Sequence, residues 1–410
     1  MATVKPFRAL RPAAAVAAEF ASLPYDVMDT TEAREMVAQN PRSFLRVTRA
    51  EVDLPPETDP HAPAVYAQAG QKLAEYVADG LLRQDETACY YVYRQKMGDF
   101  VQTGLAAVCS VAEYEAGIVR RHELTRPDKE QDRVDHILAT GAQTGPVFLV
   151  YRQDPVITAA VAKVTAGEPD YDFVAADGIA HTLWVMDDPA AVAAVEQAFA
   201  AKERLYIADG HHRAAAAARV SRLSGGREAG LFLTVLFPDN EVHILDYNRV
   251  IYDWGDLAGV EEFLNRIAAK FIVEPIRAKV ANTGKPDRLH MFGMYLDGAW
   301  YRLTPKPGSF DHNDKLARLD VNILQNNLLG PILGIADPRI DKRIGFVGGI
   351  RGMAELRRLV DSGRAVVAFS LYPTSIGELM AVADAGDIMP PKSTWFEPKL
   401  RDGVVIHTLD

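Results

Sequence analysis

Apolar residues along the chain form short continuous runs and helical stripes. CYYVYRQ (89–95) and FVQTGLAAVCSV (100–111), joined by the turn KMGD, predict a β-hairpin. Other Val-, Leu- and aromatic-rich runs predict strands over 3–10, 145–152, 205–208, 231–238, 241–253, 288–303, 365–373 and 403–409, with 231–253 and 288–303 as further hairpins. Apolar residues at helical spacing predict helices over 32–39, 65–79, 187–201, 259–271 and 320–335, the last broken near Gly330-Pro331.

This mixture of hairpins and helices favours an α+β fold over a doubly wound parallel sheet. A chain of 410 residues is too long for one ordinary core, so two domains are expected. The pattern of predicted strands and helices changes near residue 250. We therefore expect a phosphate-binding domain over 1–250, with a hairpin and a polar helix inserted, and a C-terminal α/β region over 251–410.

Composition narrows the choice of partners. A net charge of −10 argues against a general nucleic-acid binder, because such proteins present an excess of Lys and Arg to the phosphates. The start MATVKPFRALRP lacks a signal-peptide pattern, and no apolar run approaches the ~20 residues of a membrane span. Cys89 and Cys109 lie in apolar contexts, which favours buried free thiols in a reducing compartment. We expect a cytoplasmic protein, and a homodimer is compatible with the sequence.

The stretch LYIADGHHRAAAAARV (205–220) carries the most informative motif. An apolar strand, Leu205–Ala208, ends at a glycine turn, and a helix begins at His211. The free N–H groups and the dipole of a helix start favour an anion. Arg213 adds a planar fork suited to phosphate oxygens, and His212 adds a donor. Together with Gly210, these residues predict a phosphate cradle.

Two other interpretations of this motif stay open. Asp-Gly is often only a turn, and two histidines at a helix start are often a cap with surface polarity. A metal site with Asp209, His211 and His212 as ligands is a third interpretation, although adjacent histidines rarely point the same way.

The motif also carries a family resemblance. ADGHHRAAAA resembles the phosphate-binding motif of the ParB/sulfiredoxin superfamily, and within it the free-serine kinases, which phosphorylate L-serine using a nucleotide; Asp209, Gly210, His212 and Arg213 match. Nearly the whole chain resembles a bacterial and archaeal family, domain of unknown function ten-fifteen, through KPFRALRP, LPYDVMDTTEAREM, NPRSFLRVTRAEVDLP, HELTRPDKEQDR, TGPVFLVYR, ADGHHR, DYNRV and MPPKSTWFEPKL.

The kinase resemblance implies a ParB/sulfiredoxin-like core, ATP or ADP with Mg²⁺, and a role for Asp209 in activating the serine hydroxyl or organising metal. It also implies an N-terminal acid as the base. Asp26, after the tyrosine of LPYDV, and Glu32, at the next helix start, are the candidates. The alternative is that Asp26 is a turn residue and Glu32 a first-turn carboxylate favoured by the helix dipole.

The polar segment RRHELTRPDKEQDRVDH (120–136) is the second candidate site. A capping-box pattern in Thr125 and Asp128, with Pro127 in the first turn, predicts a helix that runs to about Thr140. A charged run of this kind is often a solvated, salt-bridged helix. Because binding residues concentrate on loops, we assign Arg126 and Lys129 to anion contacts and Glu123 to substrate or metal; all three are site candidates.

Three functions follow from these residues. The first is a nucleotide-dependent phosphotransferase acting on a small hydroxyl metabolite, with free L-serine converted to O-phosphoserine. The second is a non-catalytic nucleotide- or phosphometabolite-binding regulatory protein that uses the same cradle. The third is a metal-dependent hydrolase.

Overall fold

The computed structural model describes residues 1–277 and 282–410. The chain forms two compact units: unit 1 comprises 1–243 and 398–410, and unit 2 comprises 244–397. Unit 2 is therefore inserted between two parts of unit 1 in the sequence. The predicted ranges 1–250 and 251–410 assign residues 398–410 to the second region, whereas these residues lie in unit 1.

Unit 1 is built on a large mixed sheet. Within the described ranges the sheet has nine strands, in the order β6 (Val119–Arg120), β11 (Leu205–Asp209), β8 (Val147–Tyr151), β12 (Leu231–Pro238), β5 (Phe100–Ser110), β4 (Tyr90–Met97), β10 (Ala180–Met186) and β9 (Tyr171–Val174), with β1 (Val4–Lys5) beside β5. The pairs β6–β11 and β8–β12 are parallel, and the others are antiparallel. The predicted hairpin over 89–111 is confirmed as β4–β5.

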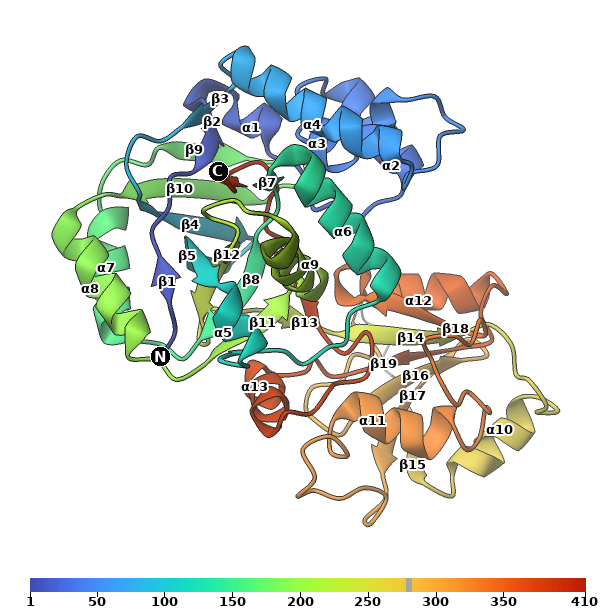
Figure 1. The fold of residues 1–410 in the computed structure, drawn as a ribbon. Coiled ribbons are helices and arrows are strands. Elements are labelled where there is room, and N and C mark those ends of the chain that lie inside the picture. Colours follow the sequence, from blue (N-terminus) through green and yellow to red (C-terminus); the bar gives the residue numbers. More distant parts are fainter. Residues whose placement is uncertain (278–281) are drawn as a thin grey trace. The chain divides into compact units, whose positions relative to one another are not determined.

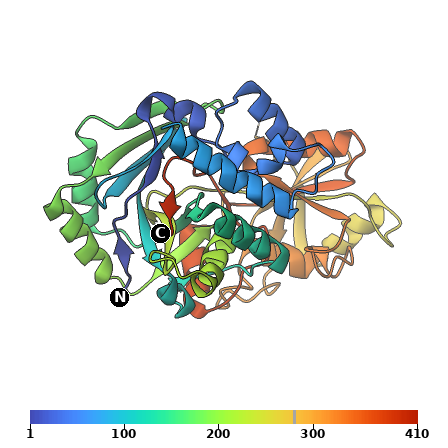
Figure 2. The same ribbon diagram turned by 45° about the horizontal axis from the view of Figure 1, so that its top comes forward.

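Helices complete unit 1 (Figure 1): α1 (Ala17–Phe20), α2 (Thr30–Gln39), α3 (Leu45–Thr48), α4 (Pro63–Ala78), α5 (Val111–Glu115), α6 (Pro127–Thr140), α7 (Pro155–Thr165), α8 (Pro189–Ala200) and α9 (His211–Leu223). Side chains from α7, α8 and α9 share one hydrophobic core with one face of the sheet. Helix α4 lies alongside α6 (Figure 2), and α6 packs against α9.

Two short two-stranded sheets pair segments of unit 1 that lie far apart in the sequence. Strand β2 (Leu10–Pro12) pairs with β3 (Leu82–Gln84), and β7 (Ala142–Gln143) pairs with β21 (His407–Thr408). Asp402 and Ser22 exchange two backbone hydrogen bonds, at 3.0 and 3.1 Å. The segment 398–410 is therefore anchored to elements from the first half of unit 1.

Unit 2 contains a six-stranded sheet among its described residues, in the order β15 (Phe271–Pro275), β17 (Ala299–Pro305), β16 (Phe292–Leu296), β19 (Val367–Ser370), β14 (Tyr247–Ile251) and β18 (Ile344–Gly348). All of its strand pairs are antiparallel. A two-stranded sheet, β13 (Ile244–Leu245) with β20 (Trp395–Phe396), and the helices α10 (Val260–Ile267), α11 (Asp320–Leu324), α12 (Gly352–Asp361) and α13 (Ile376–Ala385) accompany it. Mixed and antiparallel sheets with helices confirm the α+β class.

Some predicted elements need correction. The hairpin over 231–253 is wrong, because β12 joins the sheet of unit 1 while β14 joins the sheet of unit 2. The helix over 259–271 ends at Ile267, and Phe271 begins β15. The helix over 320–335 is α-helical over Asp320–Leu324 and π-helical over Gln325–Leu329, and it ends next to the predicted break at Gly330-Pro331. The hairpin over 288–303 is confirmed as β16–β17.

Within the parts of the chain that are described, no helix has both the length and the apolar character that crossing a membrane requires.

Candidate functional site

The motif over residues 205–220 folds as a strand, a glycine in the left-handed conformation and a helix. Leu205–Ala208 is buried in β11, and α9 begins at His211. Gly210 has φ +93° and ψ +28°, a conformation that side-chain-bearing residues rarely adopt. A Cβ atom at this position would lie 3.3 Å from Val147 Cα and 3.1 Å from Arg213 Nε. Gly210 is the N-cap, so no side chain caps the first N–H groups of α9, and uncapped N–H groups at a helix start favour an anion.

Asp209 ends β11 beside this helix start. Its Oδ2 lies 3.1 Å from Lys399 Nζ, and its Oδ1 accepts a hydrogen bond from the Gly210 N–H at 2.8 Å. Burial disfavours the charged form of this carboxyl, but the charges of Lys399 and Arg213 outweigh burial and hold the pKa of Asp209 well below its usual range. Asp209 is therefore an ionised, ion-paired carboxylate, which is a weak proton acceptor near neutral pH.

The polar segment over 120–136 contacts the motif through His212. The Nε2 atom of His212 accepts a hydrogen bond from the Arg126 backbone N–H at 3.0 Å. The Arg126 side chain is exposed and pairs with Asp128 at 2.8 Å. Lys129 is partly exposed in the first turn of α6. The structure thus joins the loop before α6 to α9 through the backbone of Arg126, and it directs the guanidinium of Arg126 to Asp128.

Helix α6 has the predicted range but not the predicted cap. It runs from Pro127 to Thr140, and Gly141 ends it in the left-handed conformation. The capping box of Thr125 and Asp128 is wrong: the N-cap is Arg126, without a side-chain cap. Thr125 Oγ1 instead donates to Glu130 Oε2 at 3.0 Å.

A small pocket lies next to the helix start, entirely within unit 1. Arg213 lines it, and one guanidinium nitrogen of Arg213 donates to the Pro146 carbonyl. Arg133, from α6, places its guanidinium 3.7 Å from the ring centre of Tyr25 and pairs with Asp132 at 2.8 Å. The residues that line the pocket are Tyr25, Arg133, His136, Ile137, Gln143, Thr144, Gly145, Val147, Arg213, Phe232, Leu233 and Asp402.

Asp402 is the acidic group of this pocket. Its side chain is 1% exposed, and within the described part of the protein its Oδ1 has no hydrogen-bond partner. Gly145 makes room for it, since a Cβ there would lie 2.5 Å from Asp402 Oδ1. Burial raises the pKa of Asp402 to about 7, although Arg213 and Arg133 act in the opposite direction. The pocket therefore combines two cations with a carboxyl that exchanges a proton near neutral pH.

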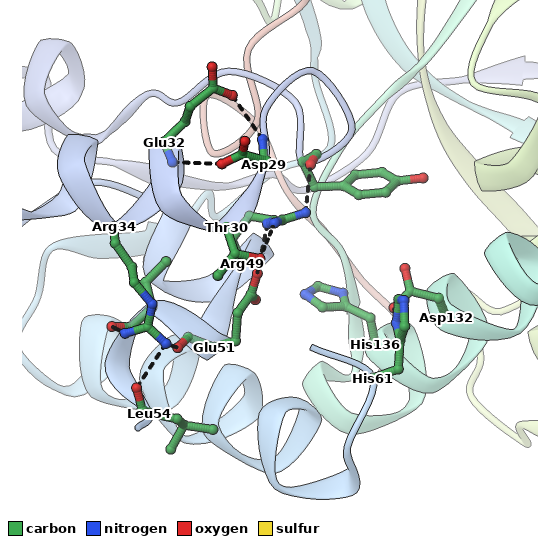
Figure 3. Close-up of polar contacts among 12 residues, drawn as sticks. Asp29, Thr30, Glu32, Arg34, Arg49, Glu51, Leu54, His61, Asp132 and His136 are labelled. Atoms are coloured by element: carbon green, nitrogen blue, oxygen red, sulfur yellow. Dashed lines mark hydrogen bonds and ion pairs between the residues drawn. The ribbon is translucent and has the colours of Figure 1, made fainter. Parts of the chain in front are cut away.

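The two N-terminal acids occupy different environments. Asp26 is exposed, and its negative charge acts on His212, Arg213 and Asp402. Glu32 forms a capping box with Asp29: each side chain accepts the other residue's backbone N–H at 2.9 Å (Figure 3). Asp26 therefore acts electrostatically on two residues of the pocket, Arg213 and Asp402, although it does not line the pocket. The Glu32 carboxylate caps the start of α2.

Glu123 lies by the buried histidine of the motif. Its Oε2 is 3.8 Å from Nδ1 of His211, and His122 packs edge-on against His211 with ring centres 4.5 Å apart. Burial lowers the pKa of His211 well below its ordinary value and that of His122 to about 4. Both rings are therefore neutral at pH 7.

Sequence reasoning missed the contributions of Asp402, Lys399 and Tyr25 to the site. Asp402 belongs to an Asp-Gly pair, like Asp209, but the chain has five such pairs, so this signal alone does not single out Asp402. Lys399 lies in the stretch MPPKSTWFEPKL, and Tyr25 precedes Asp26. Their proximity depends on the return of 398–410 to unit 1, which no local pattern encodes.

Three comparisons relate the chain to other proteins. A family model described as "Protein of unknown function (DUF1015)" matches residues 4–322. A search of curated proteins finds no match. Similar solved structures include a conserved hypothetical protein from Pyrococcus furiosus, with a TM-score of 0.36 and 14% identity over 74% of this chain and 95% of that one.

Two further solved structures are similar at the same level. A free serine kinase in complex with AMP has a TM-score of 0.36 and 13% identity over 73% of this chain and 91% of that one. SbnI with a C-terminal truncation, from Staphylococcus aureus, has a TM-score of 0.38 and 11% identity over 73% and 86%. At these TM-scores the likeness carries no inference about fold or function.

Proposed function

This chain belongs to the family described as Protein of unknown function (DUF1015), and from that premise we propose that it is a nucleotide-dependent phosphotransferase acting on a small hydroxyl metabolite. One observation carries the proposal: a helix start shaped for an anion adjoins a pocket that holds Arg213, Arg133 and the buried carboxyl of Asp402. Phosphoryl transfer needs fixed positive charge for the phosphates and a group that takes the proton of the attacking hydroxyl.

In this proposal the nucleotide phosphates lie on the N–H groups at the start of α9, with Arg213 beside them. The acceptor hydroxyl lies in the pocket against Asp402 Oδ1. The hydroxyl oxygen forms a bond to the terminal phosphorus, the bond from that phosphorus to the bridging oxygen breaks, and the nucleotide leaves with one phosphate fewer. The hydroxyl proton passes to Asp402, whose pKa of about 7 suits a general base at neutral pH.

ATP or ADP would enter with Mg²⁺, which neutralises phosphate charge when bound. Carboxylate oxygens are the protein ligands Mg²⁺ prefers. The exposed carboxylate of Asp26, whose charge acts on Arg213, fits this role. Asp209, the other carboxylate near the start of α9, is paired with Lys399, and we do not assign it to Mg²⁺.

Free L-serine is the acceptor that we propose to test first, because the ADGHHR motif resembles that of the free-serine kinases. The full chain is incubated with ATP or ADP, Mg²⁺ and a panel of hydroxyl compounds and amino acids. Nucleotide consumption and phosphorylated product are followed by ³¹P NMR and mass spectrometry. We expect O-phosphoserine from L-serine and no product from L-alanine, which lacks the hydroxyl.

The base is tested with Asp402→Asn, which keeps the shape of the side chain. We expect turnover to fall at least ~10²-fold while nucleotide still binds. In the unsubstituted chain, activity should decline as pH falls below about 7, since the base becomes protonated. Asp99→Asn, in the exposed β4–β5 turn, is the control. Turnover by Asp402→Asn within a few-fold of the unsubstituted chain would exclude Asp402 as the base.

The same assays separate the second candidate function. Tight nucleotide binding without turnover on any acceptor would favour a non-catalytic nucleotide- or phosphometabolite-binding protein. The cradle alone is sufficient for nucleotide binding, and a binding protein would not need Asp402 as a general base.

A further inference from the structure

Three potential metal ligands lie together on the loop before α6 and the first turn of α9. His122 and Glu123 belong to the loop, and His211 is the first residue of the helix. One ligand atom from each of the three residues lies within 4.8 Å of the other two. This is a different set from the Asp209, His211 and His212 of the sequence prediction.

His122 has a buried nitrogen available for a ligand. Its side chain is 2% exposed, and within the described residues its Nδ1 has no hydrogen-bond partner. A backbone hydrogen bond with Ile207 engages the ring. A ring held in this way by a backbone carbonyl, with its other nitrogen free, is the usual arrangement of a metal-ligating histidine. An unpaired buried nitrogen is otherwise costly, so its presence calls for a ligand.

The contacts of His211 leave it free to bind a metal. The His122 backbone N–H points to His211 Nε2 from 3.5 Å, and Glu123 Oε2 lies 3.8 Å from Nδ1. Both distances exceed those of ordinary hydrogen bonds, so neither contact is strong enough to fix the tautomer.

We propose that His122, Glu123 and His211 bind a divalent transition-metal ion. Two imidazoles and one carboxylate suit Zn²⁺, Fe²⁺, Mn²⁺ or Co²⁺ rather than Ca²⁺. Bonds of about 2.1 Å place tetrahedral ligand atoms about 3.4 Å apart, so the three groups must draw together. The Glu123 side chain is 45% exposed and can supply most of that movement, while the two rings stay packed.

The proposed metal site goes beyond the phosphotransferase proposal and does not depend on it. Three protein ligands leave at least one coordination position for water or another oxygen ligand. The competing ligand set is engaged elsewhere: Asp209 pairs with Lys399, and His212 Nε2 accepts the Arg126 N–H. The metal would join the loop to α9 and fix the position of His211 at the helix start.

The test is direct binding to the full chain after treatment with EDTA. We expect one equivalent of Zn²⁺ by calorimetry, and one equivalent of Co²⁺ with visible absorption typical of a low coordination number. Glu123→Gln, at a partly exposed position, should keep the fold and lower affinity at least ~10-fold. His122→Ala should lower it at least ~100-fold. Stoichiometric Zn²⁺ binding that Glu123→Gln leaves within two-fold would overturn the three-ligand site.

Two controls locate the ion. His312→Ala, at an exposed position in unit 2, should bind metal as the unsubstituted chain does. His212→Asn should also retain the affinity within a few-fold. A loss with His212→Asn equal to that of His122→Ala would instead favour the Asp209, His211 and His212 set. No stoichiometric binding of either metal would reject the proposal outright, whatever the outcome of the nucleotide assays.

Discussion

Asp209 and Asp402 are two carboxyl groups of one unit whose surroundings drive their pKa values in opposite directions. Lys399 and Arg213 keep Asp209 ionised, whereas burial brings the pKa of Asp402 to about 7. Environments that separate two acids in this way commonly assign them different tasks. We therefore assign proton transfer to Asp402. We assign Asp209 a positioning role, because its ion pair holds Lys399 beside the start of α9.

The role of Asp209 can be tested by a double-mutant cycle with Lys399. Asp209→Asn removes the ion pair but keeps the turn, so we expect a loss of about 1–3 kcal/mol in the free energy of unfolding. Asp209→Asn combined with Lys399→Met should lose less than the sum of the single changes, as measured by denaturant unfolding. Turnover should stay within ten-fold. Complete loss of turnover in a folded Asp209→Asn protein would return the catalytic role to Asp209.

Arg213 should matter for the nucleotide more than for the fold. Charge-assisted hydrogen bonds contribute roughly 1.5–3 kcal/mol, so Arg213→Ala should weaken nucleotide binding ten-fold or more in calorimetry. The matched control is Arg219→Ala on the same helix, where the guanidinium pairs with Glu130 at 3.3 Å. Equal affinity of folded Arg213→Ala and the unsubstituted chain would remove Arg213 from the cradle.

The sequence predicts the cradle residues Gly210 to Arg213 but not the distant residues that contact them. Gly210 and the helix start follow from local rules, because a buried strand, a glycine and an alanine-rich helix are contiguous. The pairing of Asp209 with Lys399 joins residues 190 positions apart. Glu32 shows the reverse case: its capping partner lies three residues away, and the sequence offers a first-turn role for its carboxylate as one of two interpretations.

Among the elements, the contact between α6 and α9 positions the site. Ala216 of α9 is buried against Val134 and Ile137 of α6. Small side chains let the two helices approach closely, so that the loop before α6 reaches His212. The alanine run predicts a helix that packs closely against the sheet. In agreement with this, the hydrophobic core that includes the sheet contains three alanines of the run, Ala214, Ala217 and Ala218. That α6 is a second packing partner follows only from the tertiary structure.

A larger side chain at this contact should destabilise unit 1. Ala216→Leu adds three carbon atoms to a fully buried position, and overpacking of this kind costs about 1–3 kcal/mol. Ala162→Leu, at an exposed position of α7, is the control and should change stability by less than about 0.5 kcal/mol. Denaturant midpoints compare the two; similar midpoints would show that α6 and α9 tolerate separation.

Most predicted elements lie where the periodicity places them, and the failures have a common physical origin. The residues over 231–253 look like a hairpin because two apolar runs flank an Asp-Asn turn. Their pairing partners lie in two different sheets, and pairing between distant strands is not encoded in local periodicity.

Buried neutral histidines are concentrated in unit 1. Burial lowers the pKa values of His122, His136 and His407 to about 4 and that of His181 to about 3. In the unfolded chain these groups take up protons below pH 6.5, whereas in the folded chain they do so only near pH 4. The stability they contribute is therefore present above pH 6.5 and is lost as pH falls toward 4.

Asp402 acts in the opposite sense, since its raised pKa makes stability fall as pH rises from about 4 to 7. One carboxyl offsets one histidine, so the histidines prevail. We expect unit 1 to be less stable at pH 5 than at pH 7.5, by up to about 1.4 kcal/mol per pH unit for each uncompensated group. Hydrogen exchange followed by mass spectrometry reads unit 1 peptides separately. His407→Gln should reduce the pH dependence; equal protection at both pH values would contradict the expectation.

The return of residues 398–410 to unit 1 has a consequence for biosynthesis. Lys399 and Asp402 leave the ribosome only after all of residues 244–397 have been translated. A nascent chain that has exposed the strand, the glycine and α9 still lacks the counterion of Asp209 and the carboxyl of the pocket. The site can therefore be completed only after unit 2 has been synthesised. If a ribosome stalls before residue 398, the released polypeptide has an incomplete pocket.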